Sequence, residues 1–129
     1  MDSKQILSVG IDIGTSTSQL VFSRLELRKR AAACQIPRFE ITDRRIVWQS
    51  PVAFTPLTDV DTLDEAALDA LIRGWYAEAG VRPEDVETGA VIVTGESLKT
   101  VNARRTVMRL ADSLGDFVVA SAGPHLESV

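Results

Sequence analysis

The sequence has very little cysteine and histidine, with one of each, Cys34 and His125, among its 129 residues. A single cysteine excludes an intrachain disulfide and favours a reducing compartment such as the cytosol. These two residues lie far apart in the sequence and form no zinc-binding pattern. We therefore expect Cys34 to be a small buried apolar residue and His125 to be structural or exposed.

Excess positive charge and long apolar runs are also missing. The formal net charge of −4 gives no electrostatic reason to expect binding to nucleic acid or to an anionic membrane. The purely apolar runs are only a few residues long, so no segment is predicted to span a bilayer, and residues 1–5 lack the apolar core of a secretory signal. The hydrophobic fraction of 45% and the charged fraction of 25% are those of an ordinary globular domain.

The first half of the chain reads as antiparallel strands. Apolar and small or polar residues alternate over 7–13, which predicts a strand, and a turn at 14–17 leads into a second strand over 19–25. The pattern then predicts a strand over 39–41, a turn over 43–45 and a strand over 46–49. The prolines that follow mark the edge or the end of the sheet, because proline lacks the donor needed inside it.

The second half alternates helices with strands. Thr62 and Glu65 have the spacing of a capping box before a helix that ends at Gly80. A buried strand over 90–93, a helix over 107–114 and a last strand over 117–120 follow, and the helical crossover predicts that these two strands are parallel. The expected fold is therefore an α/β domain, in which a mixed sheet with an N-terminal antiparallel meander is flanked by helices.

The turn after the first strand has the residue types that a magnesium–nucleotide needs. Its successive backbone N–H groups can hold oxygen anions, and Gly14 permits both the turn and the close approach of a ligand. Hydroxyl donors stand in or beside it at Thr15, Ser16, Thr17 and Ser18. Asp12, at the end of the strand, offers a hard oxygen to a hydrated Mg²⁺. The alternative is a plain hairpin in which these side chains only make turn hydrogen bonds.

This segment resembles the first phosphate motif of the actin, Hsp70 and sugar-kinase superfamily, whose domains have a ribonuclease H-like core. A closer likeness covers essentially the whole chain: residues 7–15, 22–27, 48–52, 94–97 and 115–129 resemble the reactivating factors of ethanolamine ammonia-lyase, the EutA family. The last of these stretches is the longest and most specific. The resemblance implies that residues 1–129 form the N-terminal subdomain of an actin-like ATPase. Because the chain stops at what looks like the start of a further helix, we expect it to be a fragment of a longer protein.

The resemblance also implies a function. Such proteins use ATP and Mg²⁺ to reactivate ethanolamine ammonia-lyase, a coenzyme B12 enzyme, by acting as chaperones that release a damaged cobalamin and admit adenosylcobalamin. Asp12 would hold Mg²⁺ through water, and the phosphate contacts would come from Gly14, Thr15, Ser16 and Thr17. Gly95 and Glu96 would approach the nucleotide, although Glu96 is equally explained as a loop carboxylate near a helix N-terminus. The lyase would be the partner and the cytoplasm the location, with the oligomeric state and association with a bacterial microcompartment left open.

One residue departs from the superfamily pattern. Many of its kinases and actins carry lysine or arginine seven residues after the motif aspartate, where this chain has the uncharged Gln19. That favours slow ATP hydrolysis or a nucleotide-gated change of shape. The superfamily's second phosphate loop belongs after residue 129, so we expect this chain alone to bind nucleotide weakly and not to turn it over. A small-molecule kinase and a non-catalytic interaction domain are the alternative functions.

Overall fold

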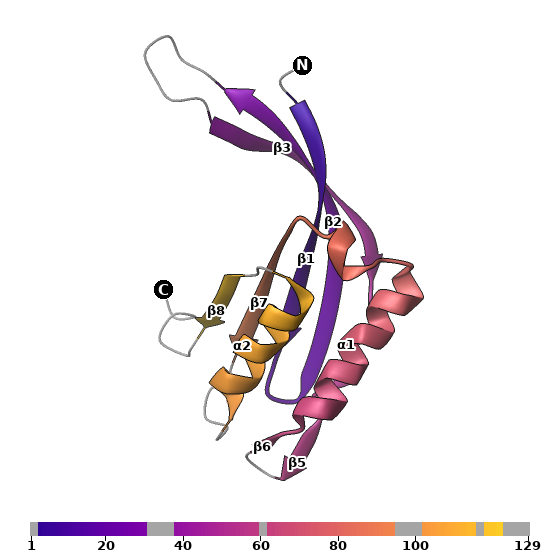
Figure 1. Ribbon diagram of the computed structural model, residues 1–129, viewed down its shortest axis with the longest axis vertical. Coiled ribbons are helices and arrows are strands. Elements are labelled where there is room, and N and C mark those ends of the chain that lie inside the picture. Colours follow the sequence, from indigo (N-terminus) through magenta and orange to yellow (C-terminus); the bar gives the residue numbers. More distant parts are fainter. Residues whose placement is uncertain (1–2, 31–37, 60–61, 95–101, 116–117, 123–129) are drawn as a thin grey trace.

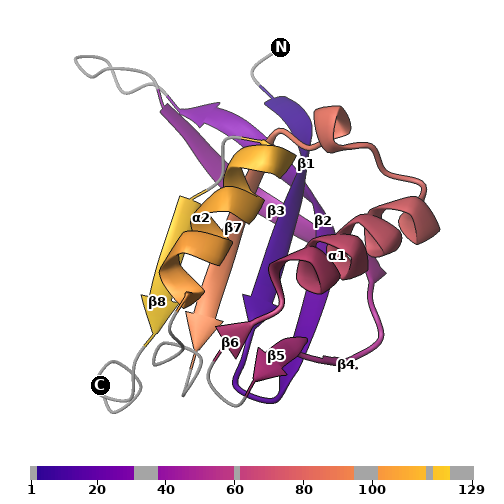
Figure 2. The same cartoon turned by 60° about the horizontal axis from the view of Figure 1, so that its bottom comes forward.

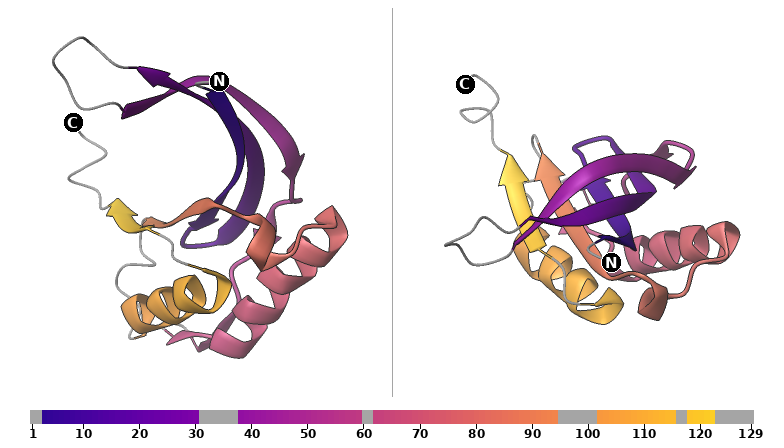
Figure 3. Two further views of the ribbon diagram at one scale, coloured as in Figure 1. Left: turned by 45° about the horizontal axis from the view of Figure 1, so that its top comes forward. Right: turned by 90° about the horizontal axis from the view of Figure 1, so that it is seen from above.

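The computed structural model describes residues 3–30, 38–59, 62–94, 102–115 and 118–122 (Figure 1). In this part of the chain six strands form one mixed sheet, ordered β3-β2-β1-β7-β8, with β4 paired to β2. Helices α1 and α2 both lie against one face of it (Figures 1 and 3). The strands of this sheet are β1 (Ser3–Ile13), β2 (Thr17–Arg30), β3 (Arg38–Gln49), β4 (Ala53–Phe54), β7 (Thr88–Thr94) and β8 (Val118–Ala122). The other elements are β5 (Leu57–Asp59), β6 (Thr62–Leu63), α1 (Glu65–Ala79), the 3-10 turn η1 (Pro83–Asp85) and α2 (Ala103–Leu114).

The pairing of the strands confirms the predicted α/β class. Strands β1, β2 and β3 form an antiparallel meander, while β7 runs parallel to both β1 and β8. The parallel pairs follow from the helical crossovers, because α1 lies between the meander and β7, and α2 lies between β7 and β8. The carboxyl ends of β1 and β7 consequently lie side by side at one end of the sheet.

The predicted turn over 43–45 is wrong. Strand β3 runs without interruption from Arg38 to Gln49, and Asp43 pairs with Glu26 on β2. The register with β2 shifts twice, so that Thr42 and Val47 stand as extra residues on β3. Bulges of this kind bend a strand without ending it, and the long ladder with β2 outweighs the local turn preference of these polar residues.

The core lies between the sheet and the two helices. Alternation along β1 buries Val9, Ile11 and Ile13, and β2 adds Leu20 and Phe22. From the helical side the buried residues are Leu68, Ile72, Trp75 and Tyr76 of α1 and Val107, Leu110, Ala111 and Leu114 of α2. The rings of Phe22 and Tyr76 meet edge to face with centroids 4.9 Å apart. Of the two tryptophans, Trp75 is buried and Trp48 packs half-buried against the core.

Helix α1 ends as predicted but begins differently. Gly80 closes it in the left-handed conformation, with φ of 72°. Its N-cap is Asp64, whose carboxylate accepts a hydrogen bond from the Ala67 N–H at 3.0 Å. The predicted capping box is therefore wrong, because Thr62 is committed to the short strand β6. The Glu65 side chain instead contacts residues of α2.

Polar contacts fix the start of α2 against α1 and β6. The buried amide of Asn102 accepts a hydrogen bond from the Leu63 N–H at 2.8 Å and donates one to the Leu63 carbonyl at 2.9 Å, as a neighbouring strand would. Glu65 accepts a hydrogen bond from the Thr106 hydroxyl at 2.9 Å and lies within 3.6 Å of Arg105. These contacts hold the starts of both helices near the end of the sheet where the β1–β2 turn lies (Figure 2).

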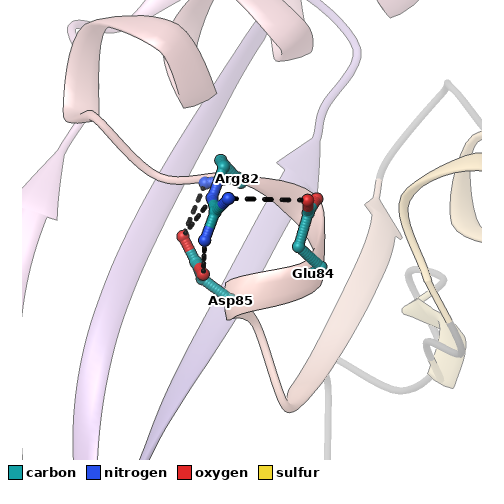
Figure 4. Close-up of polar contacts among 3 residues, drawn as sticks. All are labelled: Arg82, Glu84 and Asp85. Carbon is teal, nitrogen blue, oxygen red and sulfur yellow. Dashed lines mark hydrogen bonds and ion pairs between the residues drawn. The ribbon is translucent and has the colours of Figure 1, made fainter.

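A charged cluster at η1 shapes the entry to β7 (Figure 4). The Asp85 carboxylate accepts a hydrogen bond from the Arg82 backbone N–H at 3.1 Å and faces the Arg82 guanidinium at 3.2 Å. The backbone bond first, and the guanidinium second, lower the pKa of Asp85 below its ordinary value. Glu84 approaches the same guanidinium at 3.9 Å.

Several predictions fall outside the described residues: Cys34, His125, Gly95, Glu96 and the helix expected after Gly123. None of the helices described is both long enough and apolar enough to cross a membrane.

Candidate nucleotide site

The turn between β1 and β2 lies where the carboxyl ends of β1 and β7 meet. The Gly14 N–H donates to the Thr17 carbonyl oxygen at 2.9 Å and closes the turn. A Cβ on Gly14 would lie only 2.9 Å from that oxygen and 3.5 Å from the Thr94 side-chain oxygen at the end of β7. Gly14 does not have a positive φ, so steric space and not backbone conformation requires glycine here.

Asp12 projects from the sheet face opposite the helices. Because successive residues of a strand point to opposite faces, burying Ile11 and Ile13 directs Asp12 outward, where its side chain is exposed. No ion pair or hydrogen bond within the described part of the chain uses its carboxylate. The carboxylate is thus available to a cation at the end of β1.

Gln19 is the direct cross-strand partner of Asp12 on β2. Its amide nitrogen reaches the Ser50 carbonyl at 3.5 Å, so the side chain leans toward the end of β3. Directly opposite residues in an antiparallel pair share a face of the sheet. The uncharged amide therefore occupies the place where a lysine or arginine would stand beside Asp12.

The hydroxyl-bearing residues of the turn divide into two groups. Thr15, Ser16 and Thr17 are exposed at the turn itself. Ser18 is 1% exposed, and its hydroxyl lies 2.7 Å from that of Thr55. Ser18 therefore belongs to the interior and is not one of the donors that a ligand could reach, contrary to its position in the sequence motif.

The structure thus brings together at one corner the five described residues predicted to contact nucleotide or metal: Asp12, Gly14, Thr15, Ser16 and Thr17. Among the described residues, no three His, Cys, Asp or Glu side chains lie close enough together to hold a metal ion. A cavity of about 440 Å³ lies elsewhere, between α1 and α2, and none of the predicted site residues lines it.

Sequence reasoning missed the residues that support this corner. Strand β4 lies beside the end of the β1–β2 hairpin and pairs with it at Thr17 and Ser18 (Figure 2). Just beyond β4, the hydroxyl of the buried Thr55 donates a hydrogen bond to the Gly14 carbonyl of the turn. At the end of β3, the Ser50 hydroxyl accepts the Leu20 N–H at 2.9 Å where the ladder would otherwise stop. A strand of two residues carries no alternation, so only the flanking prolines pointed to this segment.

Comparison with known proteins adds the family. Residues 4–129 match the sequence model of the family described as Ethanolamine utilisation protein EutA. The chain belongs to the EutA family. It is 62% identical over 129 residues to the ethanolamine ammonia-lyase reactivase EutA of Escherichia coli strain K12, and equally to that of Salmonella typhimurium strain LT2. Each match covers 100% of this chain and 28% of the relative, so the chain spans just over a quarter of their length.

Solved structures show which fold this EutA-family chain has. It is similar to the Ppx/GppA enzyme of Aquifex aeolicus, with a TM-score of 0.57 and 15% identity over 94% of this chain and 37% of that one. An exopolyphosphatase-like protein gives a TM-score of 0.51 and 20% identity over 95% of this chain and 34% of that one. At such identities the likeness concerns the fold alone. It confirms the predicted ribonuclease H-like fold.

Proposed function

We propose that these 129 residues are the N-terminal nucleotide-binding subdomain of a longer reactivase for ethanolamine ammonia-lyase. The observation that carries the proposal is family membership over residues 4–129, joined by 62% identity to two proteins named as reactivases of that enzyme. The lyase is then the partner. The cytoplasm is the proposed location, and association with a microcompartment is a separate question for cell fractionation.

The β1–β2 corner is the proposed phosphate and metal site. Three of its properties suit a magnesium–nucleotide: an outward carboxylate without an ion pair in the described residues, a glycine with no room for a side chain, and exposed hydroxyls. Asp12 would hold Mg²⁺ through water, while Gly14, Thr15, Ser16 and Thr17 would bind phosphate oxygens. Gly95 and Glu96 remain candidates on the segment that follows Thr94. Bound Mg²⁺ would neutralise phosphate charge and orient the nucleotide.

ATP then serves to change the shape of the reactivase. The uncharged Gln19 beside Asp12 offers no cation to stabilise charge on a transferring phosphoryl group, which suits slow hydrolysis better than efficient transfer to a small acceptor. Binding and hydrolysis would bias the protein between a form that opens the lyase, so that damaged cobalamin leaves and adenosylcobalamin enters, and a form that releases it.

The direct test is reactivation of a cyanocobalamin-inactivated lyase by the full-length protein with ATP, Mg²⁺ and adenosylcobalamin. We expect activity to return only when all three are present, and an Asp12→Asn variant to restore much less. Omitting ATP and replacing it with a non-hydrolysable analogue are the controls that separate binding from hydrolysis. A full-length protein that leaves the lyase inactive under the complete conditions refutes the proposal.

A further inference from the structure

Thr55 makes three polar contacts at the back of the β1–β2 turn. Its hydroxyl donates to the Gly14 carbonyl oxygen at 2.9 Å, and its backbone N–H donates to the Ser16 carbonyl oxygen at 2.8 Å. The Ser18 hydroxyl lies 2.7 Å from the Thr55 hydroxyl. Thr55 and Ser18 are 7% and 1% exposed, so water does not compete with these bonds.

The direction of the hydroxyl bonds follows from counting hydrogens. A threonine hydroxyl has one hydrogen, and here it goes to the Gly14 carbonyl. The Ser18 hydroxyl therefore donates to Thr55. The result is a short chain of bonds from Ser18 through Thr55 to Gly14, in which each donor polarises the next.

These contacts fix the orientation of two peptide groups of the turn. The Gly14 and Ser16 carbonyls both point toward Thr55. A trans peptide places its C=O and its N–H on opposite sides, and the described chain has no cis bond. The N–H groups that follow these carbonyls, those of Thr15 and Thr17, therefore point away from Thr55, and the Thr17 N–H lies on the same side of β2 as the Thr17 carbonyl, facing Gly14. Thr55 thus fixes how the backbone of the turn is oriented.

We propose that Thr55 is a positioning residue of the nucleotide site: it holds the Gly14 and Ser16 carbonyls and so fixes the conformation of the turn that would contact the phosphates. The inference rests on the proposed function, because it assigns Thr55 a role at that same corner. A preorganised turn gains affinity because binding need not order it first. Thr55 touches no ligand itself and acts through the backbone of the turn.

The test compares Mg-ATP affinity, measured by titration calorimetry, across variants of the full-length protein. Thr55→Val has nearly the same shape but lacks the hydroxyl, and we expect about a tenfold loss of affinity, the equivalent of one hydrogen bond. Thr55→Ser keeps the hydroxyl and should bind within about twofold of the parent. Ser18→Ala removes only the supporting donor and should lose about threefold.

A matched control separates positioning from general stability. Thr106 is also buried and its hydroxyl donates one bond, to Glu65 at 2.9 Å, but it lies on α2 and makes no hydrogen bond with the turn in the described residues. Thr106→Val should lower the melting temperature and leave Mg-ATP affinity unchanged. If Thr55→Val does not fold, Thr55→Ser and Ser18→Ala decide the question.

Three results would count against the inference in different ways. Wild-type affinity in Thr55→Val, or in Ser18→Ala if the valine variant does not fold, would overturn it while Asp12→Asn still weakened binding. An affinity loss in Thr55→Ser as large as in Thr55→Val would also overturn it, since the hydroxyl would then not matter. Absence of Mg-ATP binding by the parent protein would remove the proposed nucleotide site and this inference with it.

Discussion

Replacing Gly14 by alanine tests the packing of the turn most sharply. The added Cβ would lie 2.9 Å from the Thr17 carbonyl oxygen, closer than carbon and oxygen atoms tolerate. That oxygen belongs to the backbone and already accepts the Gly14 N–H at 2.9 Å, so relief requires the turn itself to move. Crowding of this kind costs about 1–3 kcal/mol, and removing a glycine from the unfolded chain returns about 0.4–1 kcal/mol. We expect Gly14→Ala to lower the free energy of unfolding by about 1–2 kcal/mol.

Gly10 provides the matched control on the same strand. A Cβ there meets nothing within 4 Å, so Gly10→Ala should leave stability unchanged or raise it by up to about 1 kcal/mol. Both variants should be compared by urea unfolding at equilibrium, with equal m-values as the sign that the unfolded states match. Equal stability of Gly14→Ala and Gly10→Ala would refute the steric account of the turn.

The further predictions concern three residues elsewhere in the domain. The Tyr76 hydroxyl is buried with no hydrogen-bond partner among the described residues, so Tyr76→Phe should raise stability by about 1 kcal/mol in urea unfolding. Burial raises the pKa of Tyr76 to about 12, against a smaller opposing effect of Arg73. The unfolded chain loses the Tyr76 proton first, so wild-type stability should fall relative to that of the phenylalanine variant between about pH 10 and pH 12. Plots of stability against pH that run parallel for the two proteins would contradict this. Gly74 lies in α1 with nothing within 4 Å of an added Cβ, so Gly74→Ala should raise the melting temperature, with a gain of about 0.5–1 kcal/mol; a lower value would show a contact not accounted for. Because contacts with Arg82 lower the pKa of Asp85, its ionised form stabilises the fold, and the stability advantage over Asp85→Asn should shrink in acid unfolding below about pH 4; a constant difference would refute this.

The parts of the fold that follow from periodicity were predictable from the sequence. Alternation along β1 gave both the strand and the outward direction of Asp12, and helical spacing with Gly80 gave α1 and its end. These signals are local and strong. The parallel pairing of β7 and β8 followed from the helical crossover between them.

The errors arose where distant segments decide the outcome. Polar residues over 43–45 favour a turn locally, but pairing with β2 keeps them in a continuous strand. Thr62 had the spacing of a helix cap, yet it lies in strand β6, and Asp64 caps the helix instead. Thr55 carries no signal of its own, because its role depends on the contact between β4 and a turn about 40 residues earlier.

The most direct measurement is a titration of Mg-ATP into the full-length protein and its Asp12→Asn variant, each with Mg²⁺ and again with the metal chelated. Loss of a carboxylate that holds metal-bound water typically costs about 10–100-fold in affinity. We predict a loss of that size with Mg²⁺ present and nearly equal, weak affinities once the metal is removed. Equal affinity of the two proteins with Mg²⁺ present would contradict a metal–nucleotide site at the end of β1.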